Sequence, residues 1–171
     1  LPPGVFNLVT GDGSTGAALV KHPDISKIAF TGSTGVGKYI QKETADRDIG
    51  LTLELGGKAA NIVFNDAAID QAVEGVVNGI FFNQGHVCCA GSRLVLQEDI
   101  HDEFVTKLEK RMQSLRVGNP LDKNTDIGAI NSKDQLDKIT SLVNEGVEEG
   151  GTIFQTDCEL PQNGFWFKPT L

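Results

Sequence analysis

The stretch Ile25–Ala45, ISKIAFTGSTGVGKYIQKETA, decides the fold class of this chain. Residues 25–30 form a short apolar run typical of a buried strand, residues 31–37 are a glycine-rich loop, and residues 38–45 are typical of a helix. A strand that runs through a glycine loop into a helix is the repeating unit of folds in which helices connect parallel strands.

The neighbouring segments repeat this order. Four of them have the composition of strands or of a helix: strands at 5–10, 49–55 and 60–64, and a helix at 17–20. Pro23 ends the short helix, since proline lacks the N–H that a helix needs. The alternation predicts an α/β fold, and the paired glycines Gly56-Gly57 are the one candidate domain boundary.

The clearest helical pattern lies in the second half. Its apolar residues recur at the spacing of one helix face: Ile69, Ala72, Val73, Val76, Val77, Ile80 and Phe81. We expect this helix to point at a polar turn, residues 83–91, that leads into a strand. The later elements expected are that strand at 93–97, helices at 100–115 and 132–147, and a short strand at 152–155. Ser132 and Gln135 have capping-box spacing at the start of the last helix.

Composition narrows the classes of function. The chain has 171 residues, enough for one domain or one domain and part of another, and 39% of them are hydrophobic, so it should fold. Fifteen lysines and arginines against 23 acidic residues give a net charge of −8. A surface of that sign repels phosphate backbones, so nucleic acid is not expected as a partner.

Three cysteines are present: Cys88, Cys89 and Cys158. An odd number with two adjacent does not make a disulfide framework, and no C-x-x-C pair indicates zinc. A reducing compartment, cytoplasmic or other, is therefore expected. No apolar run reaches the roughly 18 residues of a membrane span, and the first residues lack the order of a signal peptide, so we expect a soluble protein without a membrane partner.

Two glycine loops match nucleotide-binding motifs in part. Residues 11–16 match G-x-G-x-x-G, but residues 28–31 lack the acid that should bind ribose, so an ordinary turn remains an alternative. Residues 32–38 match a Walker A loop, but Tyr39 stands where Ser or Thr would hold magnesium. The second loop predicts an anion site at a helix N-terminus, with a nucleotide triphosphatase as the alternative.

Two side chains are candidates for chemistry. Glu54 is a lone carboxylate in an apolar strand, and half-burial there would suit a general base; the alternative is an edge residue that faces solvent or pairs with Lys58. Cys88 lies in a tight turn without an acidic neighbour in sequence, and backbone amides there would favour the nucleophilic thiolate. Cys89 and Cys158 are expected to be small buried side chains.

The histidines are less informative. His86 suggests a Cys-His dyad with Cys88, but a base two residues away requires unusual turn geometry. His22 and His101 have no motif around them and are expected at the surface.

Five phrases, taken in order, resemble the NAD(P)-dependent aldehyde dehydrogenase superfamily. They are LPPGVFN at 1–7, FTGST at 30–34, LELGGK at 53–58, FNQG at 82–85 with Cys88, and GNP at 118–120. The phrases that contain Glu54 and Cys88 are the specific ones, and the separation of 34 positions between these two residues matches the family spacing. The resemblance covers the whole chain.

The resemblance implies that Cys88 attacks the aldehyde carbon and that its own backbone N–H helps to hold the oxyanion. Hydride then passes to the nicotinamide of NAD or NADP, and Glu54 activates the water that hydrolyses the thioester to a carboxylic acid. The presence of Glu54 argues against relatives that transfer the acyl group to coenzyme A. The cofactor-binding residues implied are Gly13, Gly32, Ser33, Thr34, Gly35, Val36, Gly37 and Leu55.

Within that set the resemblance implies different contacts. The loop from Gly32 to Gly37 would lie beside the pyrophosphate, Val36 beside the adenine, and the backbone of Leu55 beside the nicotinamide. Gly13 belongs to a loop one residue shorter than the common family form. His86 and Val87 stand where Gln and Cys are frequent, next to the substrate tunnel.

The resemblance also implies the organisation of the chain. Residues 1–55 would be the C-terminal part of a Rossmann-like dinucleotide-binding domain, and residues 56–171 part of an α/β catalytic domain that bears the thiol. The chain would be a central fragment of a longer protein, inactive by itself and a homo-oligomer when complete. A non-catalytic scaffolding member of the family is an alternative. The identity of the aldehyde, and NAD against NADP, stay open.

Overall fold

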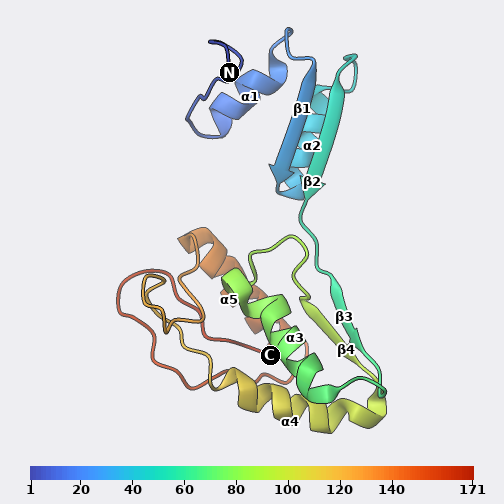
Figure 1. The fold of residues 1–171 in the computed structure, drawn as a ribbon, viewed down its shortest axis with the longest axis vertical. Helices are drawn as coiled ribbons and strands as arrows, with labels where there is room; N and C mark the ends of the chain where they lie inside the picture. The colour runs from blue at the N-terminus through green and yellow to red at the C-terminus, as the bar shows by residue number, and fades with distance from the viewer. The chain divides into compact units, whose positions relative to one another are not determined.

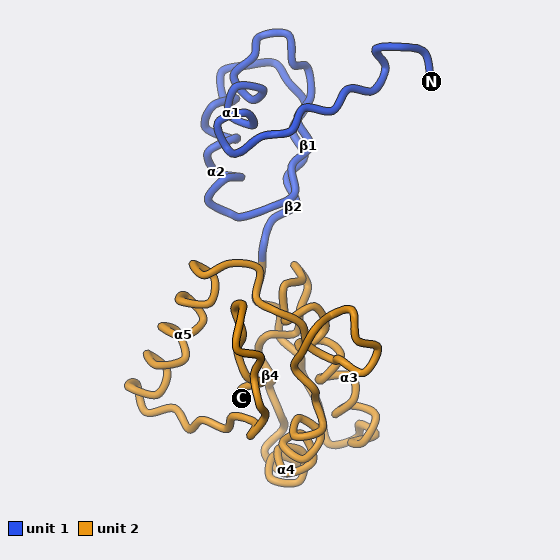
Figure 2. The backbone as a smooth tube through the Cα atoms, turned by 90° about the vertical axis from the view of Figure 1, so that its left-hand side faces the viewer, with its two compact units in different colours: residues 1–56 blue, residues 57–171 orange.

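A computed structural model describes all of residues 1–171. The chain divides into two compact units, residues 1–56 and residues 57–171 (Figure 2). Each unit contains a pair of parallel strands connected through a helix (Figure 1). This arrangement confirms the predicted α/β class.

The first unit consists, in chain order, of α1 (Gly13–Lys21), β1 (Lys27–Gly32), α2 (Thr34–Glu43) and β2 (Gly50–Leu55). The strands pair in parallel register, from Lys27 opposite Gly50 to Gly32 opposite Leu55. Helix α2 connects them and packs on both. Its buried residue Ile40 is 3% exposed.

Arg47 closes the end of α1 in this unit. Its guanidinium donates hydrogen bonds to the carbonyl oxygens of Val20, of His22 at 2.8 Å and of Ile25 at 3.2 Å. The last carbonyls of a helix have no partner within the helix, so a forked cation that reaches several of them stabilises this end. Arg47 thereby ties the segment before β2 to the segment before β1.

The strand predicted at residues 5–10 is wrong. These residues belong to no helix or strand, and their apolar side chains are exposed, as at Leu8 (77%). Residues 5–10 have side chains that suit a sheet, but a strand forms only where a neighbouring strand pairs with its backbone hydrogen-bonding groups. In this chain β1 pairs only with β2.

The second unit consists of β3 (Ala60–Val63), α3 (Ile69–Phe81), the 3₁₀ turn η1 (Phe82–Gly85), β4 (Arg93–Leu96), η2 (Glu98–Ile100), α4 (His101–Met112) and α5 (Lys133–Glu148). β3 and β4 are parallel, with Ala60 opposite Arg93 and Val63 opposite Leu96. The sequence predicted both bounds of α3. The Ser132 hydroxyl caps α5 by accepting the N–H of Gln135 at 3.2 Å.

The core of this unit lies between α3 and α4. Its buried residues are Val63, Val73, Val76, Val77, Ile100, Phe104, Leu108, Met112, Leu115 and Ile127. Phe104 and Met112 are fully buried. Salt bridges border the two helices, from Lys107 to Asp70 at 2.7 Å and from Arg111 to Glu74 at 2.6 Å.

The strand predicted at residues 152–155 is reduced to one bridge. Gln155 pairs with Thr170 in an antiparallel bridge, flanked by hydrogen bonds between Phe154 and Leu171. On the other side Thr156 donates to the carbonyl of Pro169 at 3.1 Å. Pro169 has no N–H to return, so the ladder ends there.

The N-cap of α1 makes stability depend on pH. The Asp12 carboxylate accepts the hydroxyl of Ser14 at 2.6 Å and the N–H of Ser14 at 2.8 Å. These hydrogen bonds, the hydroxyl foremost, hold the pKa of Asp12 below its usual 3.8. A depressed pKa in the folded state means that the cap stabilises α1 above the ordinary pKa and that this stabilisation is lost as the pH falls through the folded value.

We expect the thermal midpoint of the wild type to fall faster than that of Asp12→Asn below about pH 4, because asparagine caps equally well but does not titrate. The measurement is thermal unfolding followed by circular dichroism between pH 7 and pH 2. Parallel curves for the two proteins would show that the Asp12 cap does not contribute.

Candidate active site

A left-handed turn follows α3 and leads to Cys88. Asn83, Gln84 and Gly85 have φ values of 49°, 55° and 74°. Asn83 and Gln84 are the only non-glycine residues of the chain with positive φ. Side chains rarely adopt this region, at a cost on the order of 1–3 kcal/mol per residue, so contacts around the turn must hold it.

Backbone hydrogen bonds fix the segment on both sides of Cys88. The N–H of His86 donates to the carbonyl of Asn83 at 2.9 Å, and the N–H of Gly91 donates to the carbonyl of Gly79 in α3 at 3.0 Å. Between them, the N–H of Ala90 donates to the carbonyl of Val87 at 3.1 Å. Cys88 lies inside this last turn, as the sequence predicts.

The thiol of Cys88 is exposed and forms no disulfide. Its backbone N–H has no acceptor within the chain. A nucleophile with an unpaired N–H on the same residue is the pairing that stabilises a developing oxyanion in acyl transfer. The carbonyl of Cys88 faces Gly57, where an added Cβ would lie 3.5 Å from the oxygen.

The other cysteines differ from expectation. Cys89 is exposed, so its predicted burial is wrong: it shares the 87–90 turn with Cys88, and a two-residue turn tip cannot bury both side chains. Cys158 is half-buried, and the hydroxyl of Thr156 lies 3.5 Å from its sulfur.

The histidines give no dyad. His86 makes no hydrogen bond to Cys88, and its Nε2 atom is buried without a partner. His22 and His101 are exposed, as predicted. The Cys-His alternative therefore has no support from this geometry.

Glu54 lies in β2 opposite Thr31 of β1. The strand alternates, with Leu51, Leu53 and Leu55 half-buried and Glu54 exposed on the other face. Of the two interpretations of Glu54, the exposed residue is therefore the one that this chain shows, because α2 covers only the leucine face. Leu55 packs closely on α2, where a Cβ on Gly37 would lie 2.6 Å from its Cδ2.

The glycine-rich loop of the first unit is the start of α2. The hydroxyl of Ser33 caps the helix by accepting the N–H of Val36 at 3.3 Å. The N–H groups of Thr34 and Gly35 in the first turn have no acceptor in the helix, and no acidic residue lies in that turn. Val36 is 45% exposed. This helix end can accept an anionic group.

The Walker A alternative does not fit this geometry. A phosphate loop must wrap around the phosphates before its helix begins. Here α2 begins at Thr34, so residues 34–37 are helical and Lys38 lies in the second turn. Gly13 is likewise the first residue of α1, and no strand precedes its loop.

A cavity of about 560 Å³ lies in the second unit, lined by α5, the end of α3 and the last residues of the chain. Most of the side chains that α5 contributes are apolar: Ile139, Leu142, Val143 and Val147. Lys58, His86 and Ser92 contribute polar groups. Cys88 does not line this cavity, whereas Gln84, Gly85 and His86 from the turn before it do.

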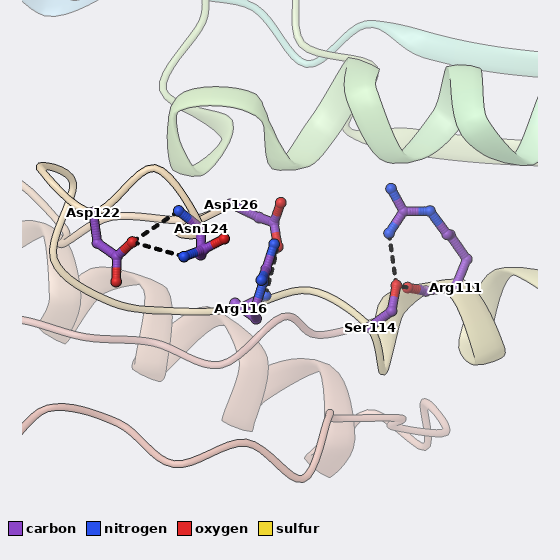
Figure 3. A network of polar contacts seen from close by, with 6 residues as sticks. All are labelled: Arg111, Ser114, Arg116, Asp122, Asn124 and Asp126. Atoms are coloured by element: carbon purple, nitrogen blue, oxygen red, sulfur yellow. Dashed lines mark hydrogen bonds and ion pairs between the residues drawn. The ribbon is translucent and has the colours of Figure 1, made fainter.

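A network of polar contacts holds the loop between α4 and α5 (Figure 3). The N–H and Nε of Arg116 donate to Asp126 at 2.9 and 3.4 Å, and Asp122 accepts two hydrogen bonds from Asn124. The N–H of Ile127 donates to the carbonyl of Arg116 at 3.0 Å. These bonds close the loop and bring the side chain of Ile127 into the core.

Gly128 follows at the point where this loop meets the turn. A Cβ on Gly128 would lie 2.5 Å from Nε2 of Gln84 and 3.6 Å from Pro120. The Gln84 side chain therefore lies directly over the backbone of Gly128. Sequence reasoning missed this contact and the left-handed turn. Asn83 before Gly85 was a local signal for such a turn, but nothing in the sequence pairs Gln84 with Gly128.

No helix combines the length and the apolar character needed to cross a membrane. No group of three or more His, Cys, Asp or Glu side chains is placed to hold a metal ion.

Comparison with known proteins identifies the family. The sequence profile of the aldehyde dehydrogenase family matches residues 1–171. The chain therefore belongs to the aldehyde dehydrogenase family, which confirms the resemblance. It is 44% identical to an aldehyde dehydrogenase-like protein of Schizosaccharomyces pombe over 99% of its own length and 34% of the relative.

Solved structures agree. An NAD-dependent aldehyde dehydrogenase from Sinorhizobium meliloti superposes with a TM-score of 0.93 at 36% identity, over 99% of this chain and 34% of that one. An aldehyde dehydrogenase from Bacillus cereus, solved as a complex with NAD⁺, gives 0.88 at 38% identity, over 94% and 33%. The chain thus spans about a third of the length of these relatives.

Gly85 should be the least replaceable glycine of the turn. Its φ is 74°, and a Cβ there would lie 3.1 Å from the carbonyl oxygen of Ile80. We expect Gly85→Ala to lower the free energy of unfolding by about 1–2 kcal/mol, because alanine disfavours the left-handed region.

The matched control is Gly75→Ala in α3, where nothing lies within 4 Å of the added Cβ. This change should stabilise the chain by up to about 1 kcal/mol through helix propensity. Urea denaturation of both variants checks the pair. Equal stability of Gly85→Ala and the wild type would mean that the turn is not held as described.

Proposed function

We propose that this chain supplies the thiol, the general base and part of the cofactor site of an NAD(P)-dependent aldehyde dehydrogenase, which oxidises an aldehyde to a carboxylic acid. The observation that carries the proposal is the exposed Cys88 thiol beside its own unpaired N–H, on a turn hydrogen-bonded on both sides, in a member of this family. In this proposal residues 1–55 are the C-terminal part of the dinucleotide-binding domain and residues 56–171 part of the catalytic domain.

The chemistry assigned to Cys88 is nucleophilic. Its thiolate sulfur forms a bond to the aldehyde carbon, and the carbonyl oxygen takes the negative charge and accepts the N–H of Cys88. When bound, the nicotinamide supplies the hydride acceptor that converts this adduct to a thioester. The thiol is exposed and neither the sulfur nor the N–H has another partner in the chain, so both are available to an incoming carbonyl group.

Glu54 is proposed as the base that takes a proton from the hydrolytic water, so that the oxygen attacks the thioester and releases the acid and the Cys88 thiolate. Glu54 is exposed on β2, so its carboxylate is accessible to water, as this role requires.

The start of α2 is proposed to bind the cofactor pyrophosphate. Its residues fit an anion, because the amides of Thr34 and Gly35 are free, Ser33 caps the helix, and the first turn holds no acid. Gly32 and the exposed Val36 complete this surface, and Leu55 ends the neighbouring strand. Gly37, also proposed as a cofactor residue, is buried and faces Leu55, so its role is to let α2 approach β2. Gly13, at the start of α1, is proposed as a further cofactor neighbour.

The remaining expectations also stand as proposals. The substrate is a small-molecule aldehyde, and the complete protein is a homo-oligomer in a reducing intracellular compartment. The three free cysteines support the compartment, since two of them are exposed thiols that an oxidising environment would not preserve.

Replacement of Cys88 tests the nucleophile. In the chain treated with p-nitrophenyl acetate, Cys88→Ala should lower acyl transfer by roughly 100-fold or more, because the remaining thiols lack this arrangement. Cys89→Ser and Cys158→Ser serve as matched controls and should retain it. Peptide mapping by mass spectrometry locates the acyl group. Equal acylation of Cys88 and Cys158 in the wild type would refute the assignment and favour a scaffolding member of the family.

Replacement of Glu54 tests the base. In the enzyme that carries this chain, Glu54→Gln should form the acyl-enzyme normally but hydrolyse it roughly 100- to 10,000-fold more slowly, since the amide cannot accept the proton. The exposed Glu98→Gln is the matched control. Single-turnover kinetics separate the two steps. Hydrolysis at the wild-type rate in Glu54→Gln would mean that another group is the base.

A further inference from the structure

The backbone conformation of the turn before Cys88 is energetically unfavourable, and this turn lies close to the thiol in sequence. Three consecutive residues, Asn83, Gln84 and Gly85, are left-handed, and Cys88 follows three residues after Gly85. Residues with a side chain disfavour a left-handed backbone, so this conformation persists only where surrounding contacts stabilise it. Two separate contacts do so here.

The first contact is a pair of hydrogen bonds between Asn83 and His86. The carbonyl of Asn83 accepts the N–H of His86 at 2.9 Å, and Nδ2 of Asn83 donates to the carbonyl of His86 at 3.2 Å. Both backbone polar groups of His86 are thus held by one residue. Asparagine is also among the few side chains that tolerate a left-handed backbone, so Asn83 favours the turn in two ways.

The second contact links the turn to the core. The amide of Gln84 covers Gly128, where a Cβ would lie only 2.5 Å from Nε2. Gly128 follows Ile127, which is 5% exposed and belongs to the core cluster. The side chain of Gln84 therefore contacts the backbone of Gly128, and the burial of Ile127 in the core holds this backbone in place.

The same segment is anchored beyond the thiol, where the N–H of Gly91 donates to Gly79 of α3. With the far side fixed to α3, the position of the Cys88 backbone, and therefore of its N–H, depends on the left-handed turn. We propose that Asn83 is the positioning residue for Cys88, and that the seating of Gln84 on Gly128 is its second support. This inference rests on the proposed function of Cys88 as the nucleophile.

If Asn83 positions Cys88, its replacement should affect two reactions of the Cys88 thiol to different extents. Acylation by p-nitrophenyl acetate develops an oxyanion that needs the aligned N–H, whereas alkylation by iodoacetamide needs only the thiolate. Cys158 in the same chain is an internal reference for both reagents. The readout is the ratio of Cys88 to Cys158 modification, measured for each reagent by mass spectrometry.

We expect Asn83→Ala to lower the acylation ratio about tenfold while the alkylation ratio changes less than about twofold, because a displaced donor affects only the oxyanion. Asn83→Gly, which keeps the left-handed preference but loses the side-chain donor, should fall between Asn83→Ala and the wild type. The matched control is Asn144→Ala on the exposed face of α5, which should leave both ratios unchanged.

Gly128→Ala provides a second variant if Asn83→Ala does not fold. Its φ is not positive, and the added methyl displaces only the flexible end of Gln84, so the fold should persist. We expect its acylation ratio to fall about threefold or more without a matching change in alkylation. An unchanged acylation ratio in the folded variants, or an equal fall of both ratios, would overturn the proposal.

The same data separate this inference from the proposed function. If wild-type Cys88 is acylated no faster than Cys158, the assignment of the nucleophile fails, and with it the basis for a positioning role. If wild-type Cys88 is selectively acylated and the variants equal the wild type, the nucleophile stands and only the role of Asn83 is wrong.

Discussion

The packing of α3 against α4 is the interaction on which the second unit depends. Val73, Val76 and Val77 of α3 and Phe104 and Leu108 of α4 are buried in one cluster. Burial of each such side chain contributes roughly 1.5–3 kcal/mol before conformational entropy is counted. The salt bridges beside this contact are partly exposed, and pairs of that kind contribute about 1 kcal/mol or less. Apolar packing therefore sets the direction of α3.

A rigid α3 has a direct consequence for the chemistry. The helix ends at Phe81 and the left-handed turn begins two residues later, so the core determines where the segment with Cys88 starts. The return of Gly91 to the carbonyl of Gly79 closes the segment on the same helix. A short loop that a packed helix holds at both ends combines exposure with fixed geometry, and the nucleophilic role proposed for Cys88 requires both.

The first unit depends less on apolar packing than the second. Its buried set is small, Val20, Ile40 and Thr44 among it, so hydrogen bonds take a larger part in its order. Asp12 caps the start of α1, Arg47 closes its end, and Ser33 caps α2. The Ser33 cap leaves the first amides of α2 free, and these amides are the groups proposed to bind an anion there.

By itself, the sequence determined what depends on local pattern. The apolar periodicity of residues 69–81 predicted α3 with its bounds, the glycine loop predicted a helix, which begins earlier than expected, at Thr34, and the family phrases identified the superfamily. Tertiary structure decided what depends on partners. Residues 5–10 lack a neighbouring strand, Pro169 stops the ladder at residue 155, and Glu54 is exposed because α2 covers only the other face of β2. The contact of Gln84 with Gly128, 44 positions apart, belongs to this second group, because only packing brings distant backbones to van der Waals distance.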